Sequence, residues 1–173
     1  SGPVPVVKNG AGTLVLDVAN TFSSALTINE GTVVAAHVQA MGSAAINVAQ
    51  GASLSLSEDL GPLIPLQIER VNGIAGRVDV GSGRFTLRSP DTSGDSVESL
   101  LLGGRNGGAW DGDAGITSSV VESDTANGIV RSVGWKENSD GSITVAYAAP
   151  GDVNLDGEVN VFDMVDVTSS GRY

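Results

Sequence analysis

Apolar and polar residues alternate along the first half of the chain in short runs separated by glycine. The runs cover residues 13–16, 26–34, 46–56 and 78–87. Alternation with a period of two places apolar side chains on one face of a strand and Thr, Ser or Asn on the other. The pattern therefore predicts half-buried β-strands, with glycine supplying the positive φ angles that the intervening turns require.

The strand pattern also repeats along the sequence. Gly31 and Gly51 are 20 residues apart, and aligning them places Ile28 on Val48. This spacing is the length of one short solenoid coil. An ordinary jelly roll or sandwich also alternates and also uses many glycines. The repeat favours a β-solenoid over that alternative.

Residues 60–77 interrupt the repeat. They carry three apolar positions broken by Pro62 and Pro65, and proline cannot donate a hydrogen bond within a sheet. We therefore expect this segment to be an excursion from the coil, which the run at 78–87 then rejoins.

Part of the N-terminal half resembles the autotransporter-associated β-strand repeat. Residues 10–14 read Gly-Ala-Gly-Thr-Leu, residues 20–22 read Asn-Thr-Phe, and residues 27–33 read Thr-Ile-Asn-Glu-Gly-Thr-Val. The family pattern is a Gly-x-Gly-Thr-Leu strand, an Asn-Thr-aromatic turn and a Thr-Ile-Asn-x-Gly-Thr-Leu strand. Residues 23–25 depart from it, with Ser-Ser-Ala in place of Thr-Gly-Gly. The resemblance implies a right-handed β-helix outside the cell and no catalytic residues.

Residues 95–119 have a different character. Asp95 is a suitable N-cap, Glu98 follows three positions later, and Gly103 is a typical helix end, so one short helix is predicted. A glycine-rich loop follows over residues 103–112.

The sequence after this loop resembles the C-terminal part of large secreted planctomycete-type proteins. In those proteins a segment similar to the one that runs through residues 116–119 precedes a calcium repeat. Two further strands are expected here, at residues 129–135 and 142–147, before the chain reaches such a repeat.

Composition and charge restrict the function classes. The chain has 20 acidic and 9 basic side chains, a net charge of −11. Nucleic-acid binding needs clustered cations, so a nucleic-acid partner is excluded. The acidity favours a cation partner, with the alternative that it only keeps an exported protein soluble. The absence of cysteine excludes disulfides and thiolate chemistry. No apolar run approaches the roughly 18 residues of a membrane span, and we expect a piece processed from a longer secreted precursor.

The strongest chemical signal is the segment at residues 152–163, Asp-Val-Asn-Leu-Asp-Gly-Glu-Val-Asn-Val-Phe-Asp. Calcium binds six to eight oxygen atoms, and positions 1, 3, 5, 7, 9 and 12 of such a loop present them. The predicted Ca2+ ligands, with Glu158 acting through its backbone carbonyl, are Asp152, Asn154, Asp156, Glu158, Asn160 and Asp163. Gly157 occupies position 6, where the chain must turn sharply. We expect Val159 to point into the core.

An aspartate at the last position makes this loop resemble a type I dockerin repeat. Phe162, Met164, Val165 and Val167 then fit the helix that follows the loop in a dockerin half. A complete dockerin has two such loops, and the sequence contains one. Val161 and Phe162 stand where a small hydroxyl pair usually recognises the partner, so cohesin docking is not implied. A second loop is either lost beyond Tyr173 or supplied by another molecule.

The sequence predicts no enzyme and no catalytic residues. His37 is the only histidine, and no Gly-x-Ser-x-Gly motif precedes a helix. Acids are sparse in the repeat region, so a carboxylate groove like that of β-helix glycosidases is not indicated. Trp110 and Trp135 are interpreted as core or hinge residues, with a sugar-stacking surface as the alternative. Asp111 and Asp113 are interpreted as turn residues, with a second cation site as the alternative.

These observations predict a mainly all-β chain in two parts. A right-handed β-solenoid, or less favourably a sandwich, covers residues 1–149, and a dockerin-like calcium half-repeat covers residues 150–173. The expected function is that of an extracellular structural or adhesive protein of a bacterial surface, which associates with itself or with another surface protein. The alternative is a carbohydrate- or protein-binding module of a secreted polysaccharide-degrading protein, with a polysaccharide as partner.

Overall fold

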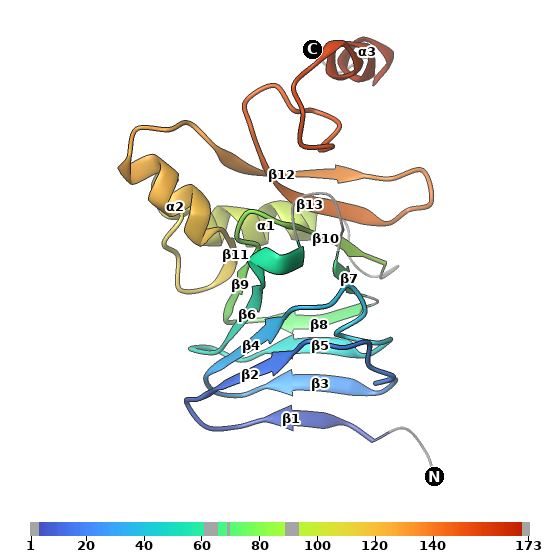
Figure 1. The fold of residues 1–173 in the computed structure, drawn as a ribbon, viewed down its shortest axis with the longest axis vertical. Coiled ribbons are helices and arrows are strands. Elements are labelled where there is room, and N and C mark those ends of the chain that lie inside the picture. The colour runs from blue at the N-terminus through green and yellow to red at the C-terminus, as the bar shows by residue number, and fades with distance from the viewer. Residues whose placement is uncertain (1–3, 61–65, 69, 89–93, 171–173) are drawn as a thin grey trace.

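The computed structural model describes residues 4–60, 66–68, 70–88 and 94–170. Strand accounts for 33% of the chain and helix for 21%, and the sheets are open. The prediction of a mainly β chain is therefore confirmed. The molecule is elongated, with the N-terminal strands at one end of the long axis and the C-terminal helix at the other (Figure 1).

Two parallel sheets form the N-terminal part, and successive strands alternate between them (Figure 1). The first sheet contains, in spatial order, β1 (Val6–Lys8), β3 (Ala25–Ile28), β5 (Ala45–Val48) and β8 (Arg70–Ile74). The second contains, in spatial order, β11 (Gly115–Thr117), β9 (Arg77–Asp79), β6 (Ser53–Leu56), β4 (Thr32–Ala35) and β2 (Thr13–Leu16). All pairs within these two sheets are parallel.

The register of the first sheet reproduces the spacing found in the sequence. Val6 pairs with Leu26, and Ile28 pairs with Val48, so each partner lies 20 residues further along. Burial alternates along β3, β4 and β6, with every second residue inside. The period-of-two pattern therefore identified both the strands and their buried faces.

The segment expected to leave the coil contributes to two sheets. Within residues 60–77, β8 pairs in parallel with β5 across an irregularity between Ile46 and Asn47. β7 (Leu66–Ile68), which follows the short 3-10 helix η1 (Glu58–Leu60), instead pairs with a strand of a third sheet. Pro62 and Pro65 lie outside the described residues. The chain therefore passes from β6 in the second sheet to β7 in the third sheet, and then to β8 in the first sheet.

The third sheet lies between the parallel sheets and the C-terminal segment (Figure 1). Its members, in spatial order, are β12 (Ser132–Glu137), β13 (Ile143–Ala148), β10 (Arg84–Leu87) and β7. β13 runs antiparallel to both β12 and β10. The strands expected at 129–135 and 142–147 correspond to β12 and β13, the first of them beginning three residues later than expected.

Three α-helices occur in the described residues: α1 (Gly94–Arg105), α2 (Ser119–Ala126) and α3 (Val161–Ser170). The short 3-10 helix η2 (Asn106–Gly108) directly follows α1. The sequence predicted α1, and it predicted α3 as the helix after the acidic loop. It missed α2, whose N-cap Ser118 accepts a hydrogen bond from the backbone N–H of Val121.

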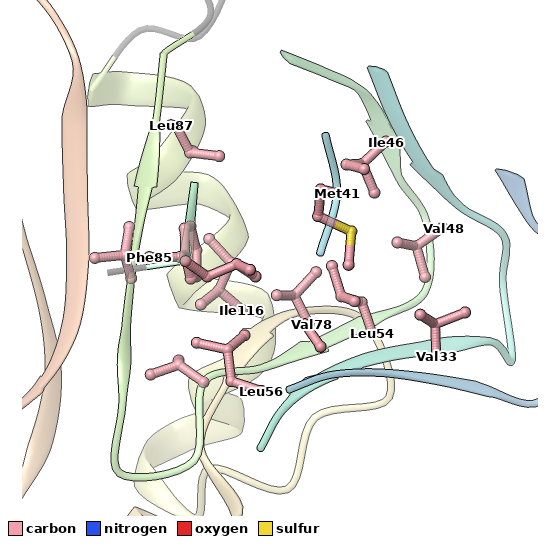
Figure 2. Packing of buried hydrophobic residues seen from close by; sticks show 14 of the residues in the cluster. Val33, Met41, Ile46, Val48, Leu54, Leu56, Val78, Phe85, Leu87 and Ile116 are labelled. Atoms are coloured by element: carbon pink, nitrogen blue, oxygen red, sulfur yellow. The ribbon is translucent and has the colours of Figure 1, made fainter. Parts of the chain in front are cut away.

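One continuous apolar cluster joins the three sheets. Leu54 and Val78 from the second sheet, Ile46 from the first and Phe85 from the third all point into it (Figure 2). A separate small cluster consists of Ala146, Ala148 and Leu155. In the described part of the chain, no helix combines the length and the apolar character needed to cross a membrane.

Candidate cation-binding loop

Residues 152–163 connect the third sheet to α3, and Leu155 fixes them to that sheet. Leu155 is 4% exposed and clusters with Ala146 and Ala148. A Cβ added to Gly134 would lie 2.8 Å from Cδ2 of Leu155, so the glycine leaves the space that this side chain fills. Val159 was expected in the core but is 56% exposed. That prediction was wrong, because Leu155 is the residue of the loop that packs inward.

Asp152 and Asp163, the first and last predicted ligands, are the most buried carboxylates of the loop. They are 6% and 4% exposed. Asp152 accepts hydrogen bonds from the backbone N–H groups of Asp156 and Gly157, both at 3.1 Å. Gly157 has a φ of 93°, which provides the sharp turn predicted at position 6. The two ends of the loop therefore carry inward-facing carboxylates held by backbone amides.

Asp163 connects both ends of the loop. One carboxylate oxygen accepts hydrogen bonds from the N–H groups of Val153 and Asn154, at 2.8 and 3.2 Å. The other accepts from the N–H of Asn160 at 2.8 Å, just before α3 begins. A single side chain thus holds the start of the loop against the start of the helix.

The intermediate ligand candidates form a chain of short-range contacts. Oδ1 of Asn154 accepts from the N–H of Asp156 at 2.8 Å, and Oδ1 of Asp156 accepts from the N–H of Glu158 at 2.9 Å. Nδ2 of Asn154 donates to Oδ2 of Asp156 at 2.9 Å. Oδ1 of Asn160 accepts from the N–H of Phe162 at 2.8 Å. The structure therefore gathers these predicted residues in one compact loop, while the side chain of Glu158 is exposed.

The carboxylates of the loop differ in their electrostatic surroundings. Burial raises the pKa of Asp152, and the N–H of Gly157 acts against that rise. The N–H of Asn160 is the main reason why the pKa of Asp163 lies below its usual range. No basic side chain among the described residues lies within 4.0 Å of either carboxylate. The negative charge of the loop therefore has no ion-pair partner in the described part of the chain.

The donor set of the loop consists of carboxylate, amide and backbone oxygens. Within the described ranges, no group of three or more His, Cys, Asp or Glu side chains is arranged to hold a metal ion. A loop of the predicted kind does not depend on such a group alone, because amide and backbone oxygens complete its shell. Each carboxylate also keeps acceptor capacity beyond its hydrogen bonds to the backbone. The chemistry of the donors fits a hard cation such as Ca2+.

The other residues considered in the sequence lie apart from this loop. Trp110 is 4% exposed, so it has no free face for stacking on a sugar, and Trp135 is half-buried against the core. Nδ1 of His37 accepts the N–H of Gln39 at 3.0 Å. Asp111 is exposed and accepts from the side chain of Asn106 at 2.9 Å. The interpretation of Trp110 as a core residue is therefore confirmed, and its alternative, a sugar-stacking role, is wrong.

The comparison with protein families gives a match in the N-terminal strands. Residues 6–35 match the family model described as Passenger-associated-transport-repeat. This range spans β1 to β4 and includes the segments that resemble the autotransporter repeat. The match supports that part of the resemblance and points to the passenger of an autotransporter-type surface or secreted protein. The comparisons with curated proteins and with solved structures gave no match.

Proposed function

We propose that this chain is a structural or adhesive part of an extracellular surface protein of the autotransporter-passenger kind, stabilised by Ca2+ in the loop at residues 152–163. The observation that carries the proposal is the passenger repeat at residues 6–35, whose strands stack in parallel on their successors with the 20-residue register of the first sheet. A body of this kind provides length and surface and needs no catalytic centre.

A β-solenoid is the architecture that we favour for the repeat region. Successive strands alternate between two sheets, and each strand pairs in parallel with a later one. A sandwich built from antiparallel hairpins would instead pair many strands with their direct neighbours in sequence. Stacking further coils would extend both sheets and the apolar interior along one direction.

The N-terminal end of these sheets supports self-association. β1 and β2 are edge strands, and they present Val7 and Val15, which are 50% and 54% exposed. Edge strands with free backbone groups can pair with another chain unless they are blunted. We therefore propose that a second copy, or another surface protein, adds to this edge and that the contact builds fibres or layers.

The calcium part of the proposal rests on the acidic loop. The residues that would hold Ca2+ are Asp152, Asn154, Asp156, the backbone carbonyl of Glu158, Asn160 and Asp163. When bound, the ion would supply a positive charge in direct contact with the carboxylates. Because Leu155 fixes the loop to the third sheet and Asp163 fixes it to α3, a bound cation would stabilise both elements together.

The size and shape of the purified chain, followed by light scattering and electron microscopy, test the assembly part. We expect ordered assemblies in calcium that shorten in chelator. Val7→Lys, which places a charge on the edge strand, should abolish them. Val130→Lys, at a residue 71% exposed between α2 and β12, is the matched control and should assemble normally. A monomer in calcium at all concentrations would contradict self-assembly.

A further inference from the structure

Arg84 lies in a row of residues that crosses the third sheet. It pairs with Ala146, and Ala146 pairs with Gly134 on the next strand. Residues directly opposite one another on adjacent strands share one face of the sheet. The neighbouring row contains Phe85 and Val145, which belong to the main apolar core. Arg84 therefore occupies the face that points away from that core.

The acidic loop covers this outer face. Leu155 packs against Ala146 and Ala148 and fills the space above Gly134. Figure 1 shows the loop and α3 on the side of β12 and β13 that faces away from the parallel sheets. Arg84 thus lies in the part of the sheet on which the loop rests.

The guanidinium of Arg84 has no ion-pair partner among the residues that the structure describes. Its Nε is buried and has no hydrogen-bond acceptor among the described residues. No acidic side chain in those ranges lies within 4.0 Å of it. Burial lowers the pKa of Arg84, and the charges of Asp152 and Asp156 act against that change. Because Leu155 packs on Ala146, the cross-strand partner of Arg84, the loop and its carboxylates lie near Arg84 without forming an ion pair with it.

We propose that Arg84 is the built-in counter-charge of the acidic loop: it stabilises the carboxylates when no cation is bound, and it weakens the binding of Ca2+. The inference rests on the proposed calcium role of the loop. A fixed positive charge and a bound cation are attracted to the same carboxylates. Each therefore reduces the electrostatic stabilisation that the other gains from them. Arg84 would thereby shift the affinity towards the weak range that suits calcium-rich surroundings outside the cell.

The test is a calorimetric titration of the full chain with calcium chloride. Arg84→Gln removes the charge, and we expect it to tighten calcium binding about three- to tenfold, the size of effect that one nearby unit charge has on a divalent ion. Arg84→Lys keeps the charge and should bind within about twofold of the wild type. Arg105→Gln makes the same change of net charge at the exposed end of α1 and should bind like the wild type.

Each outcome is decisive. Wild-type protein that binds no calcium would overturn the proposed function and this inference with it. Calcium binding that is equal or weaker in Arg84→Gln would overturn the inference alone. If Arg84→Gln unfolds in chelator, circular dichroism after adding calcium distinguishes the causes. Recovery with calcium supports the counter-charge role, and a chain that stays unfolded shows that Arg84 serves packing instead.

Discussion

Gly31 occupies the turn between β3 and β4, where the backbone of one repeat crosses that of the preceding one. Its φ is 70°, and an added Cβ would lie 2.6 Å from the carbonyl oxygen of Gly10. Gly51 stands at the equivalent position in the next repeat with a φ of 79°, but its surroundings are open. Glycine is therefore required at both positions by the positive φ. At Gly31 it is also required because there is no space for a Cβ.

The two glycines make a matched pair of variants. Gly51→Ala should lower the free energy of unfolding by about 1–2 kcal/mol, the cost of placing a Cβ in the left-handed region. Gly31→Ala should lower it by about 1–3 kcal/mol more, because the backbone of the preceding turn must also move. Urea denaturation measures both values. Equal decreases in the free energy of unfolding would show that the backbone near Gly31 moves away from the added Cβ without destabilising the chain.

At the residue scale, the sequence predicted the acidic loop better than it predicted the contact that anchors it. Asp152, Asp156, Gly157 and the other candidates could be read from one segment, because a cation loop draws its ligands from consecutive residues. Leu155 could not be recognised in this way. The space that it fills is made by Gly134 on another strand, and no local pattern connects the two positions.

The contact between the loop and the β12–β13 hairpin can be tested through Leu155. Leu155→Ala should lower the free energy of unfolding by about 2–4 kcal/mol, the usual loss for a buried leucine. Val153→Ala, at a neighbouring residue 45% exposed, should change it by less than about 0.5 kcal/mol. Chemical denaturation of both variants provides the comparison. A similar, small change in both would mean that the loop is not held by the sheet.

At the element scale, the strands of the repeat were easier to predict than α2. β2, β3 and β4 follow the alternation and the glycine turns of the sequence, because each buries one face. α2 was missed because its single buried residue, Val121, gives no helical apolar stripe. Its start depends on the Ser118 cap, and a hydrogen bond from Tyr147 to Asp124 ties the helix to β13.

At the scale of the whole molecule, two arrangements could not be read from the sequence. β8 continues the first sheet although it lies in a segment that appeared irregular, and β7 joins β10 in the third sheet. The paired residues, Ala45 with Arg70 and Leu66 with Phe85, are separated by about one repeat, but β7 and β8 lie in a stretch without the regular alternation that marks the other strands. The parallel stacking of the first strands could be predicted, because the spacing of 20 residues recurs from one repeat to the next.

Calcium binding should raise the stability of the whole molecule. A ligand that binds only the folded chain raises its free energy of unfolding by about 2.7 kcal/mol at a concentration 100 times the dissociation constant. For a chain of this size, that gain raises the melting temperature by roughly 5–10 °C. The stabilisation by the ligand should extend to the third sheet, because Leu155 packs the loop against that sheet.

The most direct test of the account is the melting temperature in saturating calcium and in chelator, followed by circular dichroism. The wild type should melt roughly 5–10 °C higher in calcium. Asp156→Asn should lose most of this increase while melting like the wild type in chelator, and Asp111→Asn, at an exposed acid outside the loop, should keep it. Equal wild-type melting temperatures in the two conditions, or a full increase in Asp156→Asn, would contradict a calcium-stabilised loop.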